Sequence, residues 1–277
     1  MTNWKLISRQ IAAKIWESKN NISLVSEVEN WLVENSYDIN SDEILNAFDN
    51  LKSMVSKQLQ GYIQQCDVRG IIPKYQFSVV DADKLIPLKS DEYTVREELS
   101  SAINLLSWRA FEHLCAHTMT ANGVTRCEVT RAAKEQGIDL IGMLDIGKMT
   151  RSSIWHDVQI RVLGQAKFSK TSIVQDEIRL FNEDMRAFAN GEGRAFKLSP
   201  DWAKSPYLAQ VGFVFSLNGF TSDAKKYAKS YCIALKDVEQ ISQDLVCSNA
   251  QTPGLTRYGS KPVFMRQEFL EHFAQLS

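Results

Sequence analysis

The chain has 277 residues, 44% of them hydrophobic and 23% charged, with a net charge of −1 at pH 7. This composition excludes a disordered chain, and the near-zero charge means that any surface facing nucleic acid must be local. The scattered cysteines show no Cys-x-x-Cys spacing and no apolar run reaches membrane-span length, which favours a reducing cytoplasm and predicts no membrane partner.

Residues 1–90 predict a helical N-terminal unit. Apolar residues recur at helical spacing in three successive segments, and Ser41 is a suitable N-cap for the third. The stretch from 69 to 93 has extended character and is interpreted as the arm that leads to the rest of the chain. Basic and acidic residues are nearly balanced, so this unit is expected to serve target recognition, partner binding or dimerisation.

Residues 91–248 predict an α/β domain with a mixed sheet. A helical pattern runs from 92 to 122 and strands follow near 124–132, 137–146 and 152–168, with a hairpin loop over 145–153. Helix and strand patterns then alternate to about residue 245. The remaining residues, 249–277, are a C-terminal extension that ends in a helix. One face of the 92–122 helix is apolar and carries Phe111, Leu114, Cys115, Thr118 and Met119.

Two of the predicted strands bring polar side chains together. Within "RVLGQAKFSK", alternation puts Leu163, Gln165 and Lys167 on one face, and Asp139 begins the preceding strand. In an antiparallel pair the start of one strand lies beside the end of its partner, so these side chains can converge. Carboxylate and amide oxygens suit Mg²⁺, and a lysine can contact phosphate or water. An ordinary polar sheet surface is the alternative.

The series "FEHL", "GIDLI", "GQAKFSK" and "GFTSDAKKYAKSYCIALKD" resembles the Mrr-like restriction endonuclease domain of the PD-(D/E)xK nuclease superfamily. The resemblance implies a restriction-endonuclease-like core with a central mixed β-sheet flanked by helices. It also implies that Asp139 binds the metal, that Gln165 replaces a carboxylate, and that Lys167 positions or activates water. Glu112 completes the site, and the backbone carbonyl of Ala166 is a further metal ligand.

The function implied by this resemblance is a Mg²⁺-dependent endonuclease that hydrolyses DNA, with Mn²⁺ able to substitute. Restriction or anti-phage defence is the expected setting, with DNA as the partner and a homo-oligomer or a defence-system protein as further partners. An RNA nuclease, a binding or assembly module whose cleavage depends on a partner, and an unrelated α/β protein are the alternatives. One departure from the family pattern is that Lys134, Glu135 and Gln136 stand where an acidic-glycine run is common.

Other chemically suggestive residues have simpler interpretations. His113 and His117 have the spacing of a zinc helix, but a solvated helical face is the favoured interpretation because no third ligand is evident. Glu128 could approach the site from a neighbouring strand, although a plain exposed position is favoured. The run from Trp155 to Asp157 is interpreted as incidental, since adjacent strand residues point to opposite faces.

Overall fold

The computed structural model describes residues 3–18, 22–68, 73–78, 80–87, 91–130, 137–150, 158–205, 207–248, 251–258 and 261–276. The chain divides into two compact units, Met1–Tyr93 and Thr94–Ser277. None of the described helices is both long and apolar enough to span a bilayer.

The first unit combines helices with a small antiparallel sheet. Its elements are α1 (Trp4–Glu17), β1 (Ile22–Ser23), α2 (Leu24–Glu34), α3 (Asp42–Val68), β2 (Tyr75–Phe77) and β3 (Lys84–Pro87), with strand order β1-β3-β2. The Ser41 hydroxyl accepts a hydrogen bond from the Ile44 amide at 3.4 Å, as expected of an N-cap.

The extended stretch near residue 80 is part of the first unit's core. Tyr75 and Leu85, from β2 and β3, are fully buried with apolar residues of α1, α2 and α3. The interpretation of this stretch as a joining arm is therefore wrong. Strands of two to four residues are too short for alternation to reveal them.

The second unit is built on a five-stranded mixed sheet. The strands are β4 (Val124–Val129), β5 (Leu140–Asp145), β6 (Gln159–Lys167), β7 (Ala209–Ser216) and β8 (Ile233–Asp237), in the order β4-β5-β6-β7-β8. The first two pairings are antiparallel, and the last two are parallel. The predicted α/β class with a central mixed sheet is confirmed.

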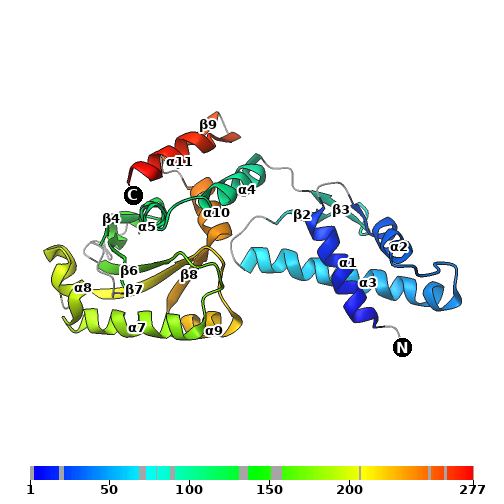
Figure 1. Cartoon of the computed structure of the whole chain (residues 1–277), viewed down its shortest axis with the longest axis horizontal. Helices are drawn as coiled ribbons and strands as arrows, with labels where there is room; N and C mark the ends of the chain where they lie inside the picture. Colours follow the sequence, from blue (N-terminus) through cyan, green and yellow to red (C-terminus); the bar gives the residue numbers. More distant parts are fainter. Residues whose placement is uncertain are drawn as a thin grey trace. The chain divides into compact units, whose positions relative to one another are not determined.

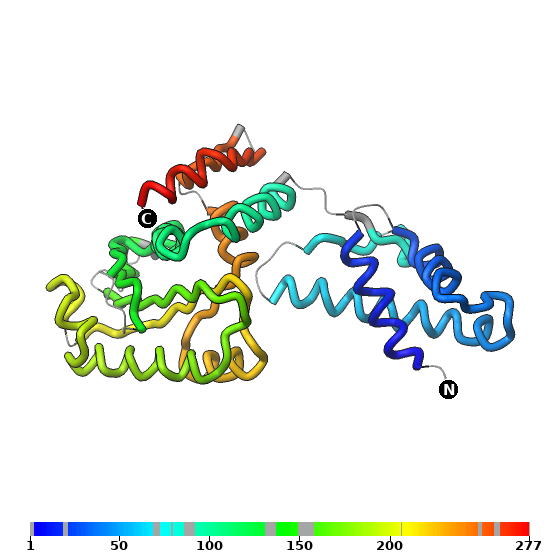
Figure 2. Tube along the Cα trace, in the orientation of Figure 1, coloured from blue at the N-terminus to red at the C-terminus, as the bar shows by residue number. Residues whose placement is uncertain are grey.

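Helices cover both faces of this sheet (Figure 1). On one face lie α4 (Asp91–Ile103), α5 (Trp108–Ala121) and α10 (Val238–Cys247), whose apolar residues share a core with Leu140, Val162 and Phe215. On the other lie α7 (Gln175–Ala189) and α9 (Ser222–Ser230), packed on Ile141, Leu163 and Val214. The chain passes from β6 to α7 on one face and from β8 to α10 on the other (Figure 2).

Shorter elements complete the unit. A short helix, α6 (Ile146–Thr150), begins where a hairpin loop was expected, and α8 (Gly193–Leu198) and the 3-10 turn η2 (Asp201–Ala203) precede β7. The C-terminal extension contains the hairpin β9 (Leu255–Tyr258) and β10 (Lys261–Phe264) before helix α11 (Arg266–Gln275).

The helix predicted over residues 92–122 is two helices. The Ser107 hydroxyl accepts a hydrogen bond from the Ala110 amide at 3.2 Å and so caps a new helix, α5. The predicted apolar face of α5 is confirmed, because Phe111, Leu114 and Cys115 are fully buried. The cap sets the start of the helix that carries Glu112.

Candidate functional site

Asp139 lies at the start of β5, directly across from the end of β6. Leu140 pairs with Gly164, so the register places Asp139 opposite Gln165. The Asp139 amide donates to the Gly164 carbonyl at 2.9 Å, and its carboxylate accepts from the Ala166 amide at 2.8 Å. Backbone and side chain of Asp139 are therefore both fixed to the strand that carries Gln165 and Lys167.

Glu112 brings a second carboxylate toward Asp139 from α5. Its side chain is 9% exposed. Burial raises the pKa of Glu112 to about 7, the negative charge of Asp139 adds to the shift, and Arg109 opposes it. The Asp139 charge thus destabilises the charge of Glu112, and such a pair of neighbouring acids favours a cation.

Lys167 lies near carboxylates from the start of β5 and from α7. Its Nζ is 3.7 Å from Glu177 Oε1 on α7. Burial raises the pKa of Asp139, and the Ala166 amide and the Lys167 charge act in the opposite direction. Burial likewise raises the pKa of Asp184 on α7, with Glu183 adding to the shift and Lys167 and the Gly137 amide opposing it. The lysine therefore acts electrostatically on Asp139 at the start of β5 and on Glu177 and Asp184 of α7.

Gln165 is buried with one end of its amide unsatisfied. The residue is 6% exposed, and its Oε1 has no hydrogen-bond partner among the described residues. An unpaired buried carbonyl oxygen costs about 1–3 kcal/mol, so such an atom calls for a ligand or water.

These donors fit a hydrated Mg²⁺ ion. The described residues contain no group of three or more His, Cys, Asp and Glu placed to hold a metal. A metal here would depend on the Glu112 and Asp139 carboxylates together with the Gln165 and Ala166 carbonyl oxygens. Mg²⁺ accepts such oxygen sets and keeps several waters, so two carboxylates are enough.

The structure thus places Asp139 opposite Gln165, near enough to Lys167 and Glu112 for electrostatic influence, with Gln165 and Lys167 on the α7 side of β6. Sequence reasoning missed Glu177 and Asp184, which lie seven residues apart on one side of α7. The sequence signals them only by this seven-residue spacing of two acids in the helix that follows "GQAKFSK". Glu128 is exposed and lines a separate cavity of about 310 Å³ beside Ala195 and Leu198. Residues 134–136 and 155–157 lie outside the described residues.

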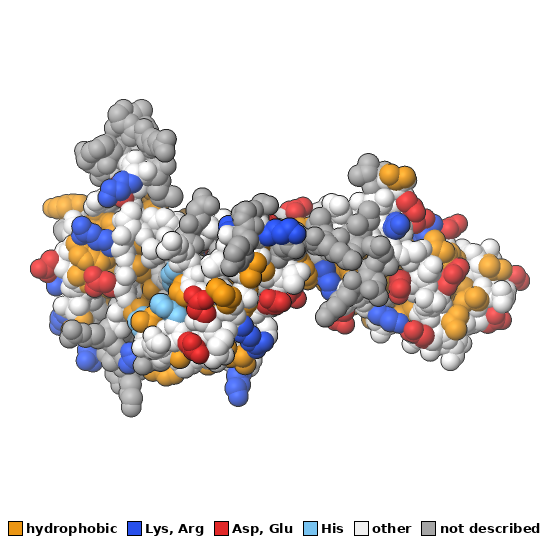
Figure 3. Space-filling view, turned by 90° about the horizontal axis from the view of Figure 1, so that it is seen from above, with side chains coloured by type: hydrophobic (Ala, Val, Ile, Leu, Met, Phe, Trp, Pro, Cys, Tyr) orange, Lys and Arg blue, Asp and Glu red, His pale blue; other side chains and the backbone are white. Residues whose placement is uncertain are grey.

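His117 does not lie on a solvated face. Its Nε2 is 3.1 Å from Thr252 Oγ1, and its ring lies edge-on to Phe273 of α11. Burial lowers the pKa of His117, and nearby His272 lowers it further. Histidine side chains gather on one face of the second unit beside apolar side chains (Figure 3). His117 is therefore a packing residue for the C-terminal extension.

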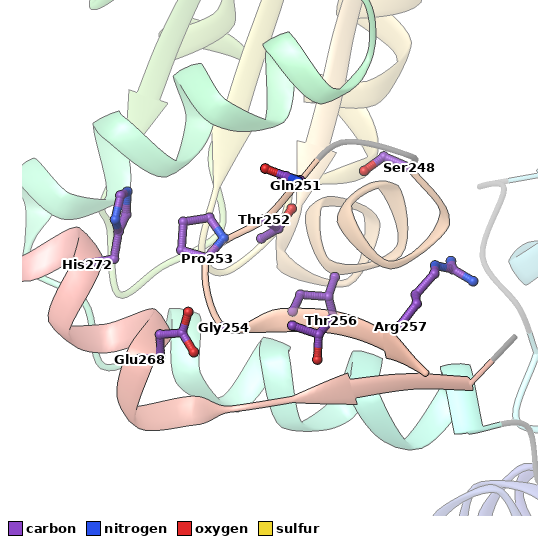
Figure 4. Close-up of a pocket in the computed structure, with 10 residues that line it drawn as sticks. Ser248, Gln251, Thr252, Pro253, Gly254, Thr256, Arg257, Glu268 and His272 are labelled. Carbon is purple, nitrogen blue, oxygen red and sulfur yellow. The ribbon is translucent and has the colours of Figure 1, made fainter. Parts of the chain in front are cut away.

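The same extension forms a cavity of about 670 Å³ away from the candidate site. Residues of the 251–257 segment line it together with Glu268 and His272 of α11 (Figure 4). Glu112, Asp139, Gln165 and Lys167 are not among its lining residues. The cavity is consequently a separate feature of the extension.

Comparisons with solved structures give three matches of low identity. The MspJI restriction endonuclease in complex with a 27-mer oligonucleotide is 17% identical, with a TM-score of 0.37, over 58% of this chain and 32% of that one. The DNA modification-dependent restriction endonuclease AspBHI is 12% identical, with a TM-score of 0.43, over 69% of this chain and 41% of that one. This chain therefore spans well under half the length of either enzyme. A protein of unknown function, AF1548, is 18% identical, with a TM-score of 0.29, over 47% of this chain and 58% of that one.

No curated protein matches the chain. The family model of the Mrr catalytic domain, described as a restriction endonuclease, matches residues 103–244. That range is just over half of the 277 residues, and it contains Glu112, Asp139, Gln165 and Lys167. The chain accordingly belongs to the Mrr-type restriction endonuclease family.

Proposed function

We propose that the protein is a Mg²⁺-dependent endonuclease that hydrolyses DNA phosphodiester bonds in restriction or anti-phage defence. The observation that carries this proposal is that Asp139, which acts electrostatically on Glu112 and is acted on by Lys167, lies opposite Gln165, whose buried Oε1 is unsatisfied, within a domain of the Mrr family. A polar sheet surface without a function would not bury an unsatisfied amide oxygen opposite a buried acid, because each such group costs free energy.

The residues of the proposed site have separate roles in metal binding and in positioning substrate or water. Glu112, Asp139, Gln165 and the Ala166 carbonyl would hold Mg²⁺, with Mn²⁺ as a substitute. When bound, the ion supplies Lewis-acid stabilisation of charge on the phosphate oxygens. Lys167 then contacts the scissile phosphate or orients the attacking water, as a fixed cation can in such a site. Asp139 holds its geometry through the Ala166 amide before substrate arrives.

The test is cleavage of modified and unmodified plasmid DNA with and without Mg²⁺. We expect Asp139→Ala and Lys167→Ala to abolish metal-dependent cleavage while circular dichroism spectra stay unchanged. Lys170→Ala is the matched control, since Lys170 is exposed and lies three residues beyond Lys167 on the same segment. Full cleavage by Lys167→Ala would mean that the strand carrying Gln165 and Lys167 does not take part in catalysis.

The same assay separates the alternatives. DNA binding without cleavage under every metal condition would indicate a binding or assembly module that depends on a partner. If RNA offered as a substrate is cleaved and plasmid DNA is not, the protein is an RNA nuclease. Cleavage of only one plasmid would reveal dependence on base modification.

We further propose that residues 1–90 supply recognition, partner binding or dimerisation, with 91–248 as the nuclease domain and 249–277 as its extension. The exposed start of α3 is acidic, with Asp42, Glu43 and Asp49. Acidic side chains repel phosphate, which favours a protein partner or a second copy over DNA at this surface. Light scattering of the full chain tests dimerisation. A cytoplasmic location is proposed from the scattered cysteines.

A further inference from the structure

Asp184 and Gln165 meet at Gly137, the residue two positions before Asp139. A β-carbon built on Gly137 would lie 1.9 Å from Asp184 Oδ2 and 3.2 Å from Gln165 Nε2. The nitrogen end of the Gln165 amide and the Asp184 carboxylate therefore border the same small space. Any residue other than glycine would displace the carboxylate from it.

Asp184 is held beside Gly137 without an ion pair to any described residue. Neighbouring Glu183, in contrast, pairs with Arg179 at 2.7 Å. Asp184 is half-buried, and burial disfavours its charge, while the Gly137 amide and the Lys167 charge favour it. The Gly137 amide therefore fixes the Asp184 carboxylate at the space that it shares with Gln165.

A glutamine ligand has a requirement that a glutamate ligand lacks. Its amide has an oxygen end and a nitrogen end of nearly the same shape, and only the oxygen can bind a metal. A carboxylate accepts hydrogen bonds and cannot donate them, so it favours the amide orientation with nitrogen on its own side. In this protein Nε2 and the Asp184 carboxylate border the same space at Gly137, and Oε1 is buried without a hydrogen-bond partner among the described residues.

We propose that Asp184 is a positioning residue that holds the Gln165 amide with its oxygen turned toward the metal site. This inference rests on the proposed function, because it assigns Gln165 a metal to bind. Asp184 acts through Gln165 and does not itself touch the metal or the DNA. On this view Gln165 can serve where the family has a carboxylate because Asp184 orients its amide.

The test is a double-mutant cycle read by calorimetric titration of Mn²⁺ and Mg²⁺ into the full chain without DNA. Asp184→Asn should weaken metal binding about tenfold or more, the usual effect of losing an orienting partner. In a Gln165→Glu background, Asp184→Asn should weaken binding no more than about threefold, the scale of a screened charge. A carboxylate presents an oxygen whichever way it turns, so orientation no longer matters there.

Glu183→Gln is the charge control, because it removes one negative charge from the next position of α7. It should change metal affinity by no more than about threefold. If Asp184→Asn has only the effect of Glu183→Gln, or has equal effects in both backgrounds, the positioning role is wrong. If Asp184→Asn fails to fold, Gly137→Ala takes its place, since it displaces the carboxylate without changing charge, with the same tenfold and threefold expectations.

Asp139→Ala distinguishes this inference from the proposed function. If Asp139→Ala leaves metal binding intact, the metal site itself is misplaced and both proposals fail. If Asp139→Ala abolishes binding while Asp184→Asn matches its control, the nuclease site stands and only the role of Asp184 is overturned.

Discussion

At the residue scale, the charge of Asp139 disfavours the charge of Glu112 in the metal-free protein. Burial is the main cause of the raised pKa of each, and the Asp139 charge adds to the shift of Glu112. Asp139 is compensated by the Ala166 amide and Lys167, whereas Glu112 has only the opposing influence of Arg109. Glu112 is therefore the acid that gives up its charge when no cation is present.

We predict that Glu112 makes the metal-free protein less stable as the pH rises. Folding raises its pKa from 4.5 to about 7, so the folded state binds this proton more tightly than the unfolded chain. The free energy of unfolding should fall between about pH 4.5 and 7 and level off above, by about 3 kcal/mol in all. Glu112→Gln should lack this fall in calorimetric melts from pH 5 to 8 in EDTA.

Glu98→Gln is the control for this measurement, because Glu98 is exposed on α4 and should leave the pH dependence of wild type unchanged. Identical pH dependence in wild type and Glu112→Gln would show that Glu112 titrates normally. Addition of Mg²⁺ above pH 7 should restore the lost stability in wild type only.

The strand residues of the site could be predicted, but their α7 neighbours could not. Alternation alone put Gln165 and Lys167 on one face of β6, and strand polarity put Asp139 beside them. These relations are local to a hairpin. Asp184 lies near Gly137 and Gln165 because α7 docks on that face of the sheet, where Phe181 and Met185 pack in the core beneath it. No spacing in the sequence encodes that distance.

At the element scale, the C-terminal extension braces the helix that carries Glu112. Phe269 and Phe273 of α11 are buried in the same core as Phe111 and Leu114 of α5. Gly254 permits this approach, since a β-carbon there would lie 2.6 Å from the Met265 carbonyl, and its φ is +69°. The sequence predicted the C-terminal helix α11. It did not predict the hairpin that precedes α11, because β9 and β10 have only four residues each.

We predict that Phe269→Ala destabilises the second unit by about 3–5 kcal/mol, because it removes a fully buried ring. The second unit's melting transition in calorimetry of the full chain should fall accordingly. Leu276→Ala is the matched control, since Leu276 is 42% exposed and should change stability by less than about 0.5 kcal/mol. Equal melting temperatures for the two variants would show that α11 does not stabilise the second unit.

At the scale of the whole molecule, the two units have separate cores. The core of the first contains buried residues only from Ile7 to Leu85, and the two cores of the second contain residues only from Val95 to Phe273. Composition and periodicity predicted the α/β class of the second unit, because its strands are long enough to alternate. They did not predict the sheet of the first unit, because its strands have two to four residues and β1 pairs with β3 from the far end of the unit.

We predict that a fragment of residues 91–277 folds without the first unit. The described residues of its two cores all lie between Val95 and Phe273, so its hydrophobic cores are built from its own segment of the chain. The fragment should keep its share of the circular dichroism signal and retain metal binding. It should melt cooperatively near the temperature at which the second unit melts in the full chain. Recognition of target or partner should be weakened or lost. An unfolded fragment, by circular dichroism and calorimetry, would mean that the nuclease core depends on the N-terminal unit and that the division into separate domains is wrong.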